Sequence, residues 1–264
     1  MNAVQKTEIT RIDLSTNEVK KTADYVAEEK PLYVFLNRTH YVTIFCSPTN
    51  LKELAVGHLL SEGIVKSVKD IDDISLSAKE STCRIKLKEN VDVEKRLKIL
   101  KHYSRVIFSV CGSQIPFQHS RRLRKIRSDL TVKAKMILEC TSRLNLLADT
   151  FRKTGGVHVA AIFKGDGTLV TLAEDIGRHN AVDKVIGAVA MDETEFGACF
   201  LALSGRLTGD IVMKAAQVGL PIVVSLAGAI DSGITVARDA NLTLIGFVRG
   251  NRMNVYNLPE RIVV

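Results

Sequence analysis

The stretch from Glu174 to Gly187 holds the densest group of chemically useful side chains in this 264-residue chain. Its first seven residues include two carboxylates, a glycine, an arginine, a histidine and an asparagine. Apolar residues follow at helical spacing, which predicts a helix over about residues 178–191. Because a helix N-terminus carries free N–H groups and positive partial charge, Arg178 and His179 could bind an anion there. The alternative is a loop capped by its own carboxylates, and the residues alone favour neither.

Cys111, in the sequence Ser-Val-Cys-Gly-Ser-Gln at 109–114, is a second candidate for chemistry. It follows a strand-like run and precedes a glycine, which predicts a place at an exposed strand end. Five positive charges lie within residues 121–127, and nearby cations make a thiolate available as a nucleophile. The alternative is a half-buried structural cysteine, and the basic run also fits a solvated helix face.

The second half of the chain has the alternating pattern that could position the first of these groups. Its apolar runs and turn signals predict strands at 157–163, 169–173, 199–203, 222–226 and 242–248, with helices at 178–191, 208–218 and 233–240. The first two strands pair across the turn Gly165-Asp166-Gly167. Such a βαβαβ series predicts a right-handed, largely parallel sheet in a layered α/β fold.

Ligands of such sheets bind outside the carboxyl ends of the parallel strands. The loops expected there, 204–210, 227–233 and 249–252, are all rich in glycine, and two of them carry Arg206, Arg249 and Arg252. The start of the 178–191 helix lies on the same edge. This arrangement favours a phosphate-bearing ligand of nucleotide size, although glycine-rich loops also occur for purely structural reasons.

The first half of the chain is typical of a smaller α+β unit. Strands are predicted at 7–14, 33–36, 41–45, 82–88 and 104–110, and a helix from about Leu51 to Glu62. His58 lies on the apolar face of that helix and is interpreted as a core histidine. A long helix from Ser128 to about Phe151 then leads into the second half. The predicted domains are residues 1–127 and 128–264, and the overall class is α/β (α+β).

The bulk composition limits the class of partner. The formal net charge of +8 and a pI near 9.3 favour an acidic partner such as a nucleic acid, a phosphorylated cofactor or an acidic protein surface. The absence of tryptophan argues against an RNA-stacking platform. Five scattered cysteines without redox-pair or zinc spacing predict a reduced, cytoplasmic protein. We see no signal peptide or apolar span, and therefore expect no membrane partner.

Several segments together resemble one protein family. They are 174–187, Thr154-Gly155-Gly156-Val157-His158, Ser204-Gly205-Arg206, 246–256 and the early helix 53–64. In these segments the chain is similar to the formate dehydrogenase accessory sulfurtransferases of the FdhD type, from about Glu29 to Ile262. The resemblance implies a sulfur carrier that accepts persulfide sulfur from a cysteine desulfurase. It would transfer this sulfur to the molybdenum (or tungsten) bis-guanine-dinucleotide cofactor before the cofactor enters formate dehydrogenase.

The resemblance also assigns residues. Cys111 matches the first cysteine of the family's Cys-Gly-x-Cys-Gly loop, whereas Gln114 replaces the second. The family's cofactor segment corresponds to Phe247, Val248, Arg249, Gly250, Asn251 and Arg252. The second departure is the sequence 229–232, where the family usually has Pro-Thr. The family's C-terminal fold resembles that of cytidine deaminases, but this chain lacks the His-x-Glu and Pro-Cys-x-x-Cys zinc ligands, so no zinc is expected.

These observations give one hypothesis and two rivals. Cys111 carries sulfur as a thiolate, while Arg206, Arg249, Arg252 and neighbouring backbone N–H groups hold guanine-dinucleotide phosphates. The remaining residues expected at this site are Arg178, His179, Asn180, Asp183, Ser204 and Gly205. Either Asp175 or Asp183 could read a guanine edge, His179 could donate to phosphate or protonate a leaving sulfur, and two cofactor halves suit a homodimer. The rivals are a cofactor-delivery chaperone without sulfur chemistry and, on net charge alone, a nucleic-acid binder.

Overall fold

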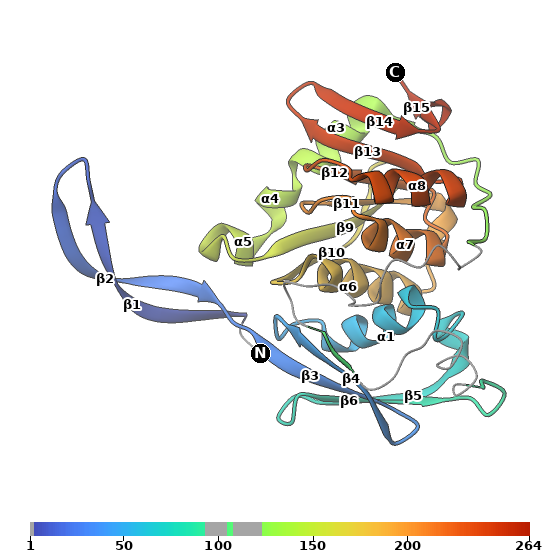
Figure 1. Ribbon diagram of the computed structural model, residues 1–264, viewed down its shortest axis with the longest axis horizontal. Coiled ribbons are helices and arrows are strands. Elements are labelled where there is room, and N and C mark those ends of the chain that lie inside the picture. The colour runs from blue at the N-terminus through green and yellow to red at the C-terminus, as the bar shows by residue number, and fades with distance from the viewer. Residues whose placement is uncertain (1–2, 93–104, 108–122) are drawn as a thin grey trace.

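The structure, a computed structural model, describes residues 3–92, 105–107 and 123–264. Over these residues two large sheets carry packed helices, and a two-stranded arm projects from the N-terminal end (Figure 1). In this part of the chain no helix is both long and apolar enough to cross a membrane. The helices are α1 (Leu51–Ser61), α3 (Ala134–Ser142), α4 (Leu144–Leu147), α5 (Asp149–Thr154), α6 (Arg178–Met191), α7 (Gly209–Val218) and α8 (Asp231–Ala240).

The larger sheet has the strand order β10-β9-β11-β12-β13-β14. These strands are β9 (His158–Lys164), β10 (Leu169–Asp175), β11 (Cys199–Leu203), β12 (Ile222–Ser225), β13 (Thr243–Arg249) and β14 (Arg252–Asn257). Only β11, β12 and β13 are parallel neighbours, so the expected largely parallel sheet is mixed instead. Tight turns join β9 to β10 and β13 to β14, and hairpin turns impose antiparallel pairing. Strand β9 also runs antiparallel to β11, which follows it after β10 and α6. The sequence pattern missed β14.

Side chains alternate between the two faces of this sheet, as the two-residue period of a strand requires. Ala160 and Ile162 pack with α6, α7 and α8, whereas Val159, Ala161 and Phe163 pack with α3 and α4. Both faces are therefore covered by helices and buried, which explains why its central strands are almost wholly apolar.

The smaller sheet has the order β5-β6-β3-β4-β7 in the described part of the chain. Its strands are β3 (Lys30–Leu36), β4 (Thr39–Cys46), β5 (Ile71–Ser77), β6 (Thr82–Leu87) and β7 (Arg105–Ile107). The predicted β3–β4 hairpin is confirmed. Helix α1 lies between this sheet and α6 (Figure 1), and one hydrophobic core runs from Leu32 to Leu244 across the expected domain boundary. The division at residue 127 stays a prediction.

Two glycines allow α1 and α6 to cross at very short range. A Cβ atom at Gly57 of α1 would lie 1.8 Å from the carbonyl oxygen of Asp183, and one at Gly187 of α6 would lie 1.9 Å from that of Glu53. Real Cβ atoms never approach so closely, so any side chain at either position would push the helices apart. The crossing fixes α6, and with it the N-terminus where Arg178 and His179 lie.

The prediction of one long helix from Ser128 to about Phe151 is wrong. Residues 132–133 form a short strand, β8 (Val132–Lys133), which pairs with β15 (Ile262–Val263), and the helical part is divided into α3, α4 and α5. Ser128 does not cap a helix, because its hydroxyl donates to the Gly197 carbonyl and accepts from the Leu130 N–H. Ala148 is extended and separates α4 from α5, and Leu147 beside it is exposed.

Replacing Gly57 with alanine is expected to lower the free energy of unfolding by about 2 kcal/mol or more, because the new methyl group would overlap the Asp183 carbonyl. Gly197→Ala is the matched control, since a Cβ there meets only a Glu195 carboxylate oxygen, at 3.6 Å. Urea unfolding of both variants and the wild type measures the difference. Equal stability of Gly57→Ala and wild type would contradict this crossing.

Candidate functional site

Four segments meet at one edge of the larger sheet, which we call the rim: the start of α6, the loops 204–210 and 226–232, and the tip of the β13–β14 hairpin at 246–252. Strands β10 and β11 both run antiparallel to β9, so they end at the same edge. Hydrogen bonds join the loops: the Ser225 hydroxyl donates to the Gly205 carbonyl at 2.6 Å, and the Leu207 N–H donates to the Gly228 carbonyl at 3.0 Å. The structure therefore brings the predicted loops together.

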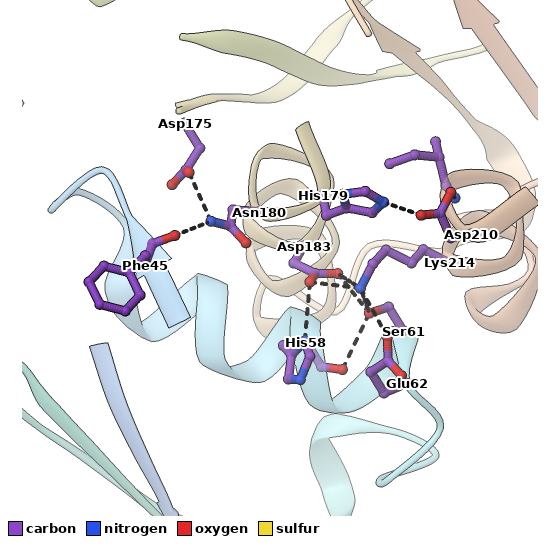
Figure 2. A network of polar contacts seen from close by, with 11 residues as sticks. Phe45, His58, Ser61, Glu62, Asp175, His179, Asn180, Asp183, Asp210 and Lys214 are labelled. Carbon is purple, nitrogen blue, oxygen red and sulfur yellow. Dashed lines mark hydrogen bonds and ion pairs between the residues drawn. The ribbon is translucent and has the colours of Figure 1, made fainter. Parts of the chain in front are cut away.

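His179 faces Asp210 across the start of α6 and α7 (Figure 2). Its Nε2 lies 2.5 Å from Oδ2 of Asp210, and the Thr208 hydroxyl donates to the other carboxylate oxygen. Burial alone would raise the pKa of Asp210, but the hydrogen bond and charge of His179 outweigh it and hold that pKa far below its ordinary value. The His179 side chain is buried, with the residue 4% exposed, and its Nδ1 has no hydrogen-bond partner among the described residues.

Arg178 stands beside the loop that follows β11. Its Nε is buried and has no hydrogen-bond partner among the described residues. The guanidinium stem lies against Gly205, where a Cβ would be 3.2 Å from the Arg178 Cβ. Buried polar atoms without partners are rare, so Arg178 and His179 both offer unfilled hydrogen-bonding capacity at the rim.

His158 and Ser204 complete this part of the rim. The Ser204 hydroxyl accepts from the Val159 N–H at 3.0 Å and lies 3.5 Å from Nδ1 of His158. Burial, and the nearby charges of Arg178 and His179, lower the pKa of His158. This environment therefore favours the neutral form of His158. Neither His158 nor Asp210 was among the predicted site residues, although both lie in segments that the sequence had singled out.

The β13–β14 hairpin carries the predicted cofactor segment. Phe247 has a positive φ of 54°, and its N–H donates to the Ala227 carbonyl at 3.0 Å. Its ring lies over Gly228, where a Cβ would come within 2.7 Å of it, and the Arg249 guanidinium stacks on the ring at 5.3 Å. Glycine at 228 is therefore required by close packing of this ring.

The turn of that hairpin places like charges together. Arg249 lies directly opposite Arg252 in the strand register, with Gly250 and Asn251 between them. Like charges at opposite positions are unfavourable. Arg206, Arg249 and Arg252 are exposed, and none has an ion-pair partner within the described residues. By contrast, Val248 is buried in the core beneath the hairpin.

Asn180 and Asp175 link the rim to the smaller sheet. The Asn180 amide donates to the Phe45 carbonyl and to Oδ1 of Asp175, both at 2.9 Å. Asp175 also pairs with buried Lys184 at 2.7 Å. Glu174 caps α5 instead, by accepting from the N–H groups of residues 150 and 151. Oδ1 of Asp175 also accepts from the Gly177 N–H at 2.9 Å, whereas Gly177 itself brings no capping side chain to α6.

Asp183 lies one helical turn below His179 and is fully engaged by other side chains (Figure 2). Lys214 of α7 donates to both carboxylate oxygens, at 3.0 and 2.9 Å. Ser61 donates at 2.6 Å, and Nδ1 of His58 lies 3.4 Å away. His58 is thus the core histidine that the sequence predicted. Asp183 and Asp175 are both satisfied inside the protein, and a role for either in reading guanine stays a prediction.

Burial and neighbouring charges together determine the electrostatics of the Asp183–Lys214 ion pair. Burial alone would raise the pKa of Asp183, but Lys214 and the hydrogen bonds from His58 and Ser61 hold it below its ordinary value. Lys214 also contacts Glu62 at 3.3 Å. The spacing of four residues repeats on both helices, from His179 to Asp183 and from Asp210 to Lys214. Two polar pairs, His179 with Asp210 and Asp183 with Lys214, are therefore stacked between α6 and α7.

The cysteines divide into two groups. Cys46, Cys83, Cys140 and Cys199 are buried, as the sequence predicted for most of them, and burial raises the pKa of Cys46 to about 12 and of Cys83 to about 11. The predicted sulfur-carrying Cys111 and neighbouring Gln114 lie outside the described residues. The described part of the basic run, residues 123–127, is not helical, and its three cations are exposed.

The last described residues before Cys111 form β7, which lies next to β4 in the smaller sheet. Ile107, the last described residue before that cysteine, pairs with Ile44 in a parallel register. Three residues beyond Ile44, the Ser47 N–H donates to Asp175 at 3.1 Å. The described structure therefore ends, on the way to Cys111, at the side of the smaller sheet that contacts the rim.

Comparison with known proteins defines the class. The model of the FdhD/NarQ family matches residues 27–263, and the chain belongs to that family. The chain is 35% identical to the sulfur carrier protein FdhD of Sulfolobus acidocaldarius over 240 residues, which is 90% of this chain and 91% of that protein. It is 34% identical to the sulfur carrier protein FdhD of Saccharolobus solfataricus over 261 residues, covering 96% and 98%.

A solved structure has the same fold. The crystal structure of a protein described as a formate dehydrogenase accessory protein from Desulfotalea psychrophila superimposes with a TM-score of 0.80. The match covers 99% of this chain and 100% of that one, at 23% identity. At this identity the likeness shows the fold alone.

Within the described residues no group of three or more His, Cys, Asp or Glu side chains is placed to hold a metal ion. The partner of His179, at the start of α6, is Asp210. That the protein works without zinc stays a prediction.

Lys214→Met is expected to lower the free energy of unfolding at pH 7 by about 3–5 kcal/mol, because the Asp183 carboxylate would stay buried without its cation. Lys86→Met is the matched control: Lys86 pairs with Asp72 on the surface, and its loss should change stability little. Denaturant unfolding compares the two variants. A similar small effect for both would contradict a stabilising role for the buried pair.

The loss of unfolding free energy caused by Lys214→Met should also depend on pH. Because the folded-state pKa of Asp183 is lowered, its stabilisation of the wild type is complete above a pH of about 4 and is lost as the pH falls below that value. In the variant a protonated Asp183 no longer needs a cation. The difference between the two proteins should therefore shrink as the pH falls, in the same unfolding measurement.

Proposed function

We propose that this protein is a sulfur carrier that supports formate dehydrogenase. Cys111 accepts persulfide sulfur from a cysteine desulfurase, and the protein delivers it to the molybdenum (or tungsten) bis-guanine-dinucleotide cofactor before insertion. The observation that carries the proposal is the match to the FdhD/NarQ family over residues 27–263, combined with a rim of arginines that have no described carboxylate partners. We propose that this sulfur transfer takes place in the cytoplasm.

Several features of the rim support a dinucleotide ligand. Arg206, Arg249 and Arg252 present planar guanidinium groups that suit phosphate oxygens, and a phosphate near the hairpin would relieve the repulsion between Arg249 and Arg252. The free N–H groups at the start of α6 and the unpartnered Arg178 Nε add donors. Phe247, stacked under Arg249, offers an aromatic edge beside them. These residues bind and orient the nucleotide ends of the cofactor.

The sulfur chemistry requires one accessible thiolate. The Cys111 thiolate attacks the outer sulfur of the donor persulfide, the donor's S–S bond breaks, and the donor cysteine leaves as a thiolate. Cys111 then holds the sulfur as its own persulfide, without any net oxidation. The four described cysteines are too deeply buried to compete. A second cysteine is not needed for this step, so Gln114 does not prevent it.

Finer parts of the proposal follow the family. We propose that residues 128–264 have the layered arrangement of cytidine deaminases, with the metal edge reused for nucleotide binding. We also propose a homodimer, since the cofactor carries two guanine-dinucleotide halves. The rival is a chaperone that holds and delivers the cofactor without sulfur transfer. Strong RNA or duplex binding at physiological salt would instead favour a nucleic-acid binder.

Calorimetry with GDP tests the rim. We expect GDP to bind, and Arg249→Ala to weaken the affinity about tenfold through loss of a charge-assisted phosphate contact. Arg238→Ala is the matched control, because Arg238 is an exposed arginine in the last turn of α8, away from the loops of the rim. An Arg249→Ala protein with unchanged GDP affinity would remove Arg249 from the site.

Intact mass spectrometry after incubation with a cysteine desulfurase and cysteine separates the carrier from the chaperone. The wild type should gain the mass of one sulfur atom, which a reductant removes. Cys111→Ser should gain none, whereas Cys140→Ala, which removes a buried cysteine, should still gain it. The chaperone reading would be supported if the wild type gains no sulfur but binds GDP.

A further inference from the structure

A groove lies at the edge of the larger sheet opposite the rim. Helices α6 and α7 both begin at the rim, so their last residues, Met191 and Val218, lie at the other edge. Two adjoining cavities open there, the first of about 330 Å³ and the second of about 290 Å³. Because Gln217 and Val218 line both cavities, we treat the two as one surface and call it the end groove. The proposed function uses no residue of this surface.

The floor of the end groove is apolar. Leu60, Val65 and Ala190 line the first cavity, and Ile126 and Ala216 line the second. All five residues are buried, so they lie beneath the opening of the groove and not on its outer edge. Concave sites with such a floor take up apolar groups, because burial removes the apolar surface of the ligand from water.

The walls of the end groove are basic. Five of the lining side chains are cations and only one, Glu193, is a carboxylate. The cations are Lys66, Lys69, Arg124, Lys125 and Arg127, all exposed and without an ion-pair partner within the described residues. The C-terminal ends of α1, α6 and α7 each contribute about half a negative charge, which offsets fewer than two of these cations. The remaining positive charge favours an acidic ligand.

The fold holds the basic wall of the second cavity in place. The Ile126 N–H donates to the Ala240 carbonyl at 2.8 Å, and the Ile126 carbonyl accepts from the Asn241 amide at 3.2 Å. The Ile126 side chain belongs to the main hydrophobic core. Lys125 and Arg127 on either side of it therefore point outward, and a ligand that binds them meets a wall that is already formed.

An acidic peptide fits this surface better than a nucleic acid does. Single-stranded nucleic acids bind by stacking their bases on aromatic side chains, and Phe196 is the one aromatic residue among those that line the two cavities. Aliphatic side chains form the floor instead, with cations beside both cavities. A peptide can place apolar side chains in the cavities and its carboxylates beside the cations.

We propose that the end groove docks a linear acidic segment of a partner protein, in which carboxylates flank apolar side chains. The segment lies across Gln217 and reaches into both cavities. Because the rim is at the opposite edge, the protein partner and a nucleotide ligand can be bound at the same time. The inference depends neither on sulfur transfer nor on GDP binding.

Fluorescence anisotropy with the labelled peptide Glu-Glu-Leu-Glu-Leu-Glu-Glu tests the docking. We expect a one-to-one complex with the wild type, and replacement of both leucines with serine should weaken it about tenfold or more. Gln217→Glu should weaken it at least about fivefold, because a carboxylate of the same shape would then stand between the two cavities. Gln5→Glu is the matched control, since Gln5 is an exposed glutamine on β1, the first strand of the N-terminal arm.

Charge reversal in each cavity tests whether one peptide occupies both. Lys69→Glu in the first cavity and Lys125→Glu in the second should each weaken the binding about fivefold. The double variant should weaken it about twenty-fivefold, because the effects of separate sites on one complex multiply. Lys79→Glu reverses an exposed lysine in the turn between β5 and β6 and should leave the affinity unchanged.

Four results would overturn the proposal. They are a wild type that does not bind the peptide, an affinity that Gln217→Glu or either charge reversal leaves unchanged, displacement of the peptide by saturating GDP, and tighter binding of a labelled RNA oligonucleotide that the same substitutions weaken. The thermal midpoints of the variants should match that of the wild type, since the substituted residues are exposed. GDP affinity measured on the same samples separates the two sites, because loss of GDP binding with intact peptide binding would count against the rim alone.

Discussion

The close crossing of α1 on α6 is the contact on which the rest of the structure depends. Gly57 and Gly187 bring the two backbones together, and the carboxylate of Asp183, buried at the same crossing, requires the ammonium of Lys214 from α7. A buried carboxylate without a cation would be very unfavourable, so this ion pair favours the arrangement in which α7 packs beside the crossing of α1 and α6. That arrangement sets the angle of α6 and therefore where Arg178 and His179 stand.

The rim shows how a fold can use its structural contacts to prepare a binding edge. The ion pair of Asp183 with Lys214 between α6 and α7 is buried and structural, whereas the hydrogen-bonded pair one turn above it, His179 with Asp210, lies at the rim. The lower pair holds the helices in register, and the upper pair keeps a histidine oriented with its second nitrogen unpartnered. Structural and binding roles are thus separated by a single helical turn.

The sequence predicted most elements of the larger sheet, because each strand is a short apolar run bounded by glycine-rich turns. It also located the rim, since strand ends and glycine-rich loops are local signals. It failed where long-range contacts decide: Ser128 looked like a helix cap but donates to Gly197, and β14 depends on pairing with β13. Asp183 was assigned to the site for its residue type, and only the fold shows that Lys214 engages it. The places of His158 and Asp210 at the rim likewise become visible only in the folded structure.

One detail of the hairpin affects how the protein should be handled. Arg249 and Arg252 are held opposite each other by the strand register, so the folded state retains a repulsion that any bound anion reduces. A ligand that binds only the folded chain also raises its apparent stability by mass action. The melting temperature of this protein therefore depends on the anions of the buffer as well as on the chain. The value measured in phosphate or sulfate should differ from the value measured in chloride.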